Sequence, residues 1–104
     1  MIKLYTIGFT GKSAEKFFNL SILAPYGKIY EGEVTSIVAP GGVGYLGILY
    51  NHAPLVTTLQ AGKFMLKDIK GLEEKFLVKG DGFLEVLNNK VTVLVKGIEK
   101  SADV

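Results

Sequence analysis

The sequence has no cysteine, no arginine and no tryptophan, and its single histidine is His52. The absence of cysteine excludes disulfides, thiolate nucleophiles and cysteine-ligated zinc. The absence of arginine excludes the bidentate guanidinium clamp that binds phosphate or guanine. Lysine supplies all of the positive charge, and the formal net charge is only +2. Because the lysines are scattered along the chain, we do not expect specific binding of nucleic acid.

The sequence also lacks an uninterrupted hydrophobic run, although no charged residue occurs between Val34 and Gly62. A segment of this length could span a bilayer. Pro40, Pro54 and several glycines would interrupt a membrane helix there, and lipid cannot satisfy the broken backbone. We therefore interpret the segment as strands and tight loops. If it lies at the surface, such an uncharged region is typical of a contact with a partner.

The remaining composition is that of one small globular domain: 104 residues, of which 48% are hydrophobic and 21% charged. Short runs of β-branched and aromatic residues alternate with turn signals such as Asn88-Asn89. This spacing predicts an all-β sandwich or barrel. The predicted strands are 19–23, 33–38, 44–49, 55–59, 63–69, 75–79, 83–87 and 91–95, with turns at 25–28, 80–82 and 88–89.

The two ends of the chain differ from this β-rich body. Residues 1–17 predict a strand–turn–helix extension, with a strand over 3–7 and a weakly amphipathic helix over 12–18. The sequence leaves open whether this extension is natural, fused or added for expression. The predicted division is an extension over 1–17, a sandwich domain over 18–96 and a polar tail over 97–104.

Motifs that would indicate catalysis are incomplete. Gly11-Lys12-Ser13 resembles the end of a phosphate-binding loop, but Thr6 stands where that motif requires glycine. His52 is the one candidate general base near neutral pH, and no nearby hydroxyl is spaced to pair with it. Glu31 and Glu33 share one face of a strand, which favours a solvated edge over an acid–base pair. We therefore predict no catalytic residue, no metal site and no cofactor.

Several segments, taken together, carry more information than any single residue. In order and in spacing they resemble the N-terminal β-sandwich domain of the epsilon subunit of F-type ATP synthase, in a short form without the C-terminal helical hairpin. The resemblance covers about residues 18–103, and the Gly44–Leu55 and Gly80–Val86 blocks are specific as a pair. The matching segments are 20–25, 30–34, 44–49, 51–55, 80–86 and 89–94.

The resemblance implies a flattened sandwich of about ten mostly antiparallel strands at the foot of a rotating central stalk. It implies a non-catalytic subunit that couples rotation of the c-subunit ring to the gamma subunit and the catalytic head. The location it implies is peripheral, on the cytoplasmic side of a bacterial energy-transducing membrane, with attachment through the complex and no insertion. In the family the hairpin would begin just after Asp103, so the resemblance implies neither its braking function nor a nucleotide site here.

The resemblance also assigns two sets of partner contacts. Val43, Gly44, Tyr45 and Leu46 match the loop that faces the c-ring, although many relatives have an acidic or polar residue where Tyr45 stands. The gamma-facing positions match Ala24, His52 and Thr57. All but Ala24 lie within the uncharged segment, and a permanent interface favours a core with few charges.

Two other functions remain open from the sequence. A free-standing β-sandwich binding module would be a stable monomer with a ligand groove lined by aromatic residues. An enzyme would place His52 in a cleft beside a hydroxyl or a carboxylate. A stalk subunit, in contrast, would co-purify with a gamma-like chain.

Because two short elements cannot form a core of their own, we predict that deletion of Met1–Lys16 leaves the sandwich folded. Thermal denaturation of the truncated protein followed by circular dichroism should retain one cooperative transition. Loss of that transition would mean that the extension is an integral part of the fold.

Overall fold

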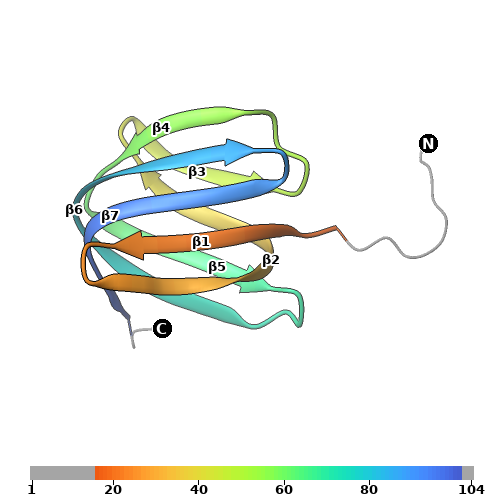
Figure 1. Ribbon diagram of the computed structural model, residues 1–104, viewed down its shortest axis with the longest axis horizontal. Helices are drawn as coiled ribbons and strands as arrows, with labels where there is room; N and C mark the ends of the chain where they lie inside the picture. Colours follow the sequence, from red (N-terminus) through yellow and green to blue (C-terminus); the bar gives the residue numbers. More distant parts are fainter. Residues whose placement is uncertain (1–15, 102–104) are drawn as a thin grey trace, which may run out of the picture.

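The computed structural model describes residues 16–101, which form seven β-strands and no helix (Figure 1). No segment of this range is therefore a helix long enough to cross a membrane. Residues 1–15 and 102–104, with most of the predicted extension, lie outside the described residues. The strands are β1 (Phe18–Ala24), β2 (Gly27–Gly41), β3 (Gly44–Leu49), β4 (Leu55–Leu59), β5 (Gly62–Asp68), β6 (Glu73–Leu87) and β7 (Lys90–Lys100).

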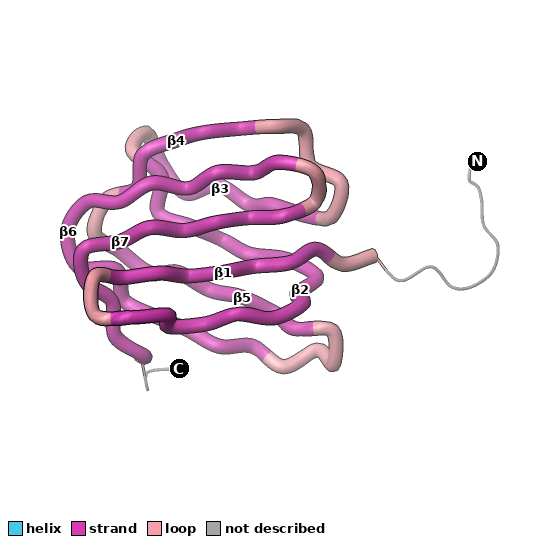
Figure 2. Tube along the Cα trace, in the orientation of Figure 1, coloured by secondary structure: helices cyan, strands magenta, loops and turns pink. Residues whose placement is uncertain are grey.

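The strands form two layers, and β2, β6 and β7 each cross from one layer to the other (Figure 2). Layer one has the order β4, second half of β6, first half of β7, β1, first half of β2. Layer two has the order β3, second half of β2, β5, first half of β6, second half of β7. All neighbours are antiparallel except β1 and β7. The seven strands thus supply ten segments, and the predicted flattened sandwich is confirmed.

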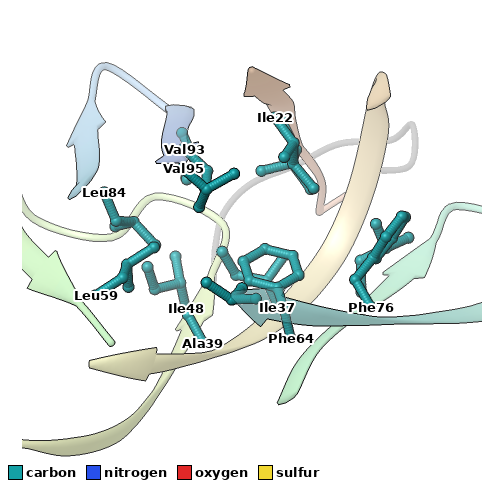
Figure 3. Packing of buried hydrophobic residues seen from close by; sticks show 14 of the residues in the cluster. Ile22, Ile37, Ala39, Ile48, Leu59, Phe64, Phe76, Leu84, Val93 and Val95 are labelled. Atoms are coloured by element: carbon teal, nitrogen blue, oxygen red, sulfur yellow. The ribbon is translucent and has the colours of Figure 1, made fainter. Parts of the chain in front are cut away.

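The hydrophobic core lies between the two layers, where alternate residues of each strand point inward. Ile22 and Val93 extend from layer one toward Phe64 of layer two, which pairs with Phe76, and Leu84 lies beside Leu59 (Figure 3). The two phenylalanine rings meet edge to face, with centroids 6.4 Å apart. This arrangement suits the quadrupoles of the rings and fixes the spacing of β5 and β6.

The turn predicted at 80–82 is wrong, because β6 continues through these residues as a bulge. Lys79 pairs with Gly97 and Gly82 with Val95, so two residues of β6 lie opposite the single residue Lys96. Gly80 has a φ of 86°, which bends the strand from one layer into the other. A Cβ atom on Gly82 would lie 2.5 Å from the carbonyl oxygen of Leu94.

The same bulge explains why β7 continues past residue 96, where the sequence predicted the end of the sandwich domain. The buried positions of β7 are Val91, Val93 and Val95, and the next is Ile98, so the alternation shifts by one residue at the bulge. Strict alternation therefore does not predict the part of β7 after the bulge, although the strand continues to Lys100. The helix expected over 12–18 is also wrong at its end, because Phe18 already belongs to β1.

The predicted Asn88-Asn89 turn is confirmed. Asn88 and Asn89 have φ angles of 51° and 60°, the left-handed pair that joins two strands by a tight turn. Asn89 also fixes the start of β1, since its side-chain amide donates to the carbonyl of Phe17 at 2.8 Å. The β6–β7 turn is thereby attached to the beginning of the domain.

Val93 is fully buried at the centre of layer one, between Leu84 of β6 and Ile22 of β1. We predict that Val93→Ala lowers the free energy of unfolding by about 1–3 kcal/mol, because it removes buried methyl groups and leaves a small cavity. Urea denaturation measures this change. An unaltered midpoint would contradict the burial of Val93.

Gly82→Ala tests the crossing of β6. We predict a loss of about 1–3 kcal/mol, because the added methyl would collide with backbone at 2.5 Å. Gly47→Ala is the matched control, since its nearest atom, the carbonyl oxygen of Ile37, would be 3.9 Å away. Equal melting temperatures for the two variants would show that close packing at the bulge is not required.

Candidate partner interface

The β2–β3 hairpin contains all four residues predicted to face a ring. Val43 lies in the turn with its side chain fully exposed, and Gly44 begins β3. The Leu46 side chain is half-buried and packs against the core. Val43 is therefore the residue that the hairpin presents outward, and it offers an apolar contact.

Tyr45 is anchored more firmly than a loop-tip residue would be. Its hydroxyl oxygen accepts a hydrogen bond of 3.2 Å from the backbone N–H of Lys63. The ring lies beside Gly62, where an added Cβ would be 3.0 Å from the hydroxyl. Tyr45 thus attaches the β2–β3 hairpin to the start of β5, although its side chain is 61% exposed.

His52, predicted to face gamma, lies in the β3–β4 loop with its Nδ1 atom 2.8 Å from the carbonyl oxygen of Ala53. The backbone N–H of Asn51 donates to the Asn89 side chain, which connects this loop to the β6–β7 turn. Nearby, the ammonium of Lys16 lies 5.8 Å from the centre of the Tyr50 ring. The contact with Ala53 positions the histidine ring within the loop.

Ala24 and Thr57 lie farther apart than a single contact patch would require. Ala24 ends β1 and packs against the core, whereas Thr57 lies in β4 opposite Leu84. The second half of β6 and the first half of β7 separate these two strands. The structure therefore places His52 and Thr57 on one side of layer one and Ala24 on the other.

An exposed apolar surface on layer one was missed by the sequence analysis. On the outer face of layer one, Val56, Phe83 and Leu94 are 70%, 56% and 48% exposed. Phe83 and Leu94 are cross-strand partners. They border a shallow groove of about 200 Å³ whose other lining residues are Pro25, Gly82, Val95, Asp81 and Lys96.

A signal for this surface was present in the sequence. The segment Val91–Val95 has apolar residues at both inward and outward positions, and so does Phe83–Leu87. Strands with this pattern are typically covered on both faces. Here the core covers one face, and the other is exposed in the isolated chain, as expected for an interface.

Layer two presents a different outer surface. Lys63, Lys67 and Lys75 lie at outward positions of β5 and β6. Layer one instead has Glu31, Glu33 and Glu85 at outward positions. The exposed carboxyl of Glu31 has a pKa below its ordinary value because Lys28 donates a hydrogen bond to it. Both faces nevertheless carry charges of both signs, since Glu73 lies opposite Lys67 on layer two and Lys90 lies opposite the exposed Leu87 on layer one.

Tyr30 is a titratable group whose pKa is shifted by its surroundings. Burial raises the pKa of Tyr30, and the negative charges of Glu74 and Asp68 raise it further, so this phenol stays neutral. Between residues 16 and 101 no cluster of three His, Cys, Asp or Glu residues could hold a metal ion. What the described surface can do chemically is bind other proteins through apolar and backbone groups.

The fold is similar to two solved assemblies. The first is the Euglena gracilis mitochondrial ATP synthase OSCP/F1/c-ring, in which one chain matches with a TM-score of 0.77, covering 89% of this chain and 59% of that one. The second is the Tetrahymena thermophila mitochondrial ATP synthase central stalk/c-ring, with a TM-score of 0.65, covering 77% and 63%. Sequence identity is 18% in both, so these likenesses establish the fold alone.

Sequence relatives are closer. An ATP synthase epsilon chain of Natranaerobius thermophilus is 43% identical over 91 residues, which are 88% of this chain and 64% of the relative. The epsilon chain of Chlorobium limicola is 40% identical over 86 residues, which are 83% of this chain and 97% of that protein. This chain thus spans less than two thirds of the first relative and nearly all of the second.

Residues 17–101 match the sequence family described as ATP synthase, Delta/Epsilon chain, beta-sandwich domain. The match includes every strand of the structure. It also includes both sets of predicted partner residues and the exposed apolar surface. The chain therefore belongs to the ATP synthase delta/epsilon family.

Proposed function

We propose that this protein is a non-catalytic subunit of the central stalk of F-type ATP synthase. It couples rotation of the c-ring to the gamma subunit and the catalytic head. Membership of the delta/epsilon family supports this proposal. The single observation that supports it most directly is that the sandwich exposes apolar side chains at two separate places, Val43 in the β2–β3 turn, and Val56, Phe83 and Leu94 on the outer face of layer one.

The hairpin suits a contact with the c-ring. Val43 projects fully into solvent, and Tyr45 attaches the hairpin to β5. A contact that transmits torque requires such an anchored loop, because a loosely held one would yield under load. In this proposal Val43, Gly44, Tyr45 and Leu46 face the ring.

The gamma subunit covers the outer face of layer one in this proposal. Val56, Phe83 and Leu94 form the apolar centre of the contact, because buried aromatic and aliphatic side chains dominate the energetics of interfaces. In this proposal the margins of the contact are the loop before β4, which contains His52, and the end of β1 at Ala24. Thr57 lies in β4 opposite the buried Leu84, so its backbone borders the contact while its side chain is on the inward face. The subunit is then peripheral, bound through the complex on the cytoplasmic side of a bacterial energy-transducing membrane.

The groove beside Phe83 is the feature that a free-standing binding module would use. It is shallow, and Phe83 is the single aromatic residue in its lining. A small ligand usually requires a deeper enclosure that buries most of its surface. The groove is better suited to one side chain of a protein partner.

Leu94→Lys tests the gamma-facing surface. We predict at least a tenfold loss of affinity for a purified gamma subunit in a pull-down titration, because the lysine charge would be buried in the contact. The control is Leu77→Lys, the same change at an exposed outward position of layer two. Equal retention of gamma by both variants, each with its native melting temperature, would contradict this assignment.

Val43→Asp and Tyr45→Asp test the hairpin. We predict that both reduce ATP-driven proton pumping in reconstituted vesicles, because each adds a charge to the contact with the ring. Tyr45→Asp also removes the bond to Lys63 and should lower stability by about 0.5–1.5 kcal/mol, whereas Val43→Asp should not. Unchanged pumping with both variants would count against a ring contact at the hairpin.

A further inference from the structure

Each layer of a sandwich ends in two edge strands, whose outward backbone groups can pair with another chain. Natural proteins protect such edges with charges, prolines, short strands or a covering group. The edges here are β4 and the first half of β2 in layer one, and β3 and the second half of β7 in layer two.

A tyrosine side chain covers the edge of β7. The hydroxyl of Tyr26 donates to the carbonyl oxygen of Ile98 and accepts from its N–H, both at 3.0 Å. In layer one, the edge of β2 has charged groups, Lys28, Glu31 and Glu33. These two edges are therefore protected against added strands.

The edge of β4 is short and partly used. This strand has five residues, and Pro54 precedes it. The carbonyl of Thr58 accepts from the N–H of Gly42 at 3.1 Å, and the N–H of Gln60 donates to the carbonyl of Pro40 at 2.9 Å. Bonds to β2 thus occupy the end of this edge.

β3 is also short, with six residues, but in the described part of the chain it has no charge, proline or covering group. Its sequence, Gly-Tyr-Leu-Gly-Ile-Leu, contains no charge and no proline. Its one sheet neighbour within residues 16–101 is β2. Tyr45 and Leu49 are 61% and 62% exposed, and Gly47 lies between them on the same face.

The register identifies the backbone groups at the free edge. Pro40 has no N–H, and its carbonyl accepts from Gln60, so its backbone faces away from β3. Tyr45 lies opposite Pro40, and pairing in an antiparallel ladder alternates from residue to residue. The N–H and C=O groups of Tyr45, Gly47 and Leu49 therefore point away from β2.

We propose that this edge accepts an additional strand, an extended and uncharged segment of the stalk subunit that docks on this domain. The inference rests on the proposed function and adds to it a mode of binding. Main-chain bonds at Tyr45, Gly47 and Leu49 would supply affinity. A bulky apolar side chain of the added strand would cover Gly47 between Tyr45 and Leu49, which provides specificity.

The size of the edge favours a segment of a larger partner over a second copy of the chain. A stable interface between two proteins buries about 1,200–2,000 Å² in total. One six-residue strand paired with its own copy buries much less than this. An added strand that belongs to a broader contact does not have to supply this area by itself. A broader contact is available next to the edge, because β3 continues directly into the loop that contains His52.

The test uses ATP synthase depleted of its own epsilon-type subunit, to which the full chain is bound. Amide hydrogen exchange at Tyr45, Gly47 and Leu49 should slow at least tenfold on binding. The amide of Ile48 faces β2 and serves as the internal reference, because the ladder already protects it.

Gly47→Lys and Gly47→Ala form the matched pair of variants. Both leave the fold unchanged in our prediction, since a Cβ at this position meets its nearest atom at 3.9 Å. Gly47→Lys should weaken binding to the depleted complex at least tenfold, because it introduces a charge where the added strand lies. Gly47→Ala adds a methyl group without a charge and should weaken binding less than Gly47→Lys does.

The outcomes separate the two proposals. A complex that forms without slower exchange at these three amides would overturn the strand addition and leave the stalk function standing. Failure of the wild-type chain to bind the depleted complex would overturn both. A second copy of the chain could also pair with this edge. In that case exchange at the three amides of the free protein would slow as its concentration rises, and sedimentation would show a dimer. This result would overturn the proposal.

Discussion

The structure depends on three strands that belong to both layers. Because β2, β6 and β7 each cross the sandwich, the layers are joined by continuous backbone as well as by side chains. Gly80 and Gly82 make the crossing of β6 possible, one through its positive φ and the other through the close approach of Leu94. Moving one layer against the other would require breaking the β6–β7 ladder. That rigidity is what a force-transmitting subunit needs.

The proposed functions of the surface follow from this rigid frame. The apolar outer face of layer one, the anchored hairpin around Tyr45 and the unprotected edge of β3 have different orientations, yet all belong to one backbone unit. Contacts at separate places on such a body move together when one of them is pushed. In the proposed stalk, rotation of the ring would reach gamma through the sandwich without any chemical step in this chain.

Much of the fold could be predicted from the sequence, since short apolar runs between turn signals located β3 and β4 at their observed bounds and Asn88-Asn89 identified the last turn. The bulge was the exception, because Gly80–Gly82 has the composition of a turn and its effect on the alternation of β7 depends on pairing with a distant strand. The candidate site was less predictable. The exposure of Phe83 and Leu94 and the unprotected edge of β3 depend on which strands are neighbours, and a single sequence does not specify this.

The central claim is that this chain connects a rotating ring to its stalk. The most direct measurement is ATP-driven proton pumping by membranes whose ATP synthase has been depleted of its epsilon-type subunit, before and after addition of the purified chain. We predict that the chain restores pumping in proportion to the amount bound. Binding without any recovery of pumping, while ATP hydrolysis continues, would contradict it.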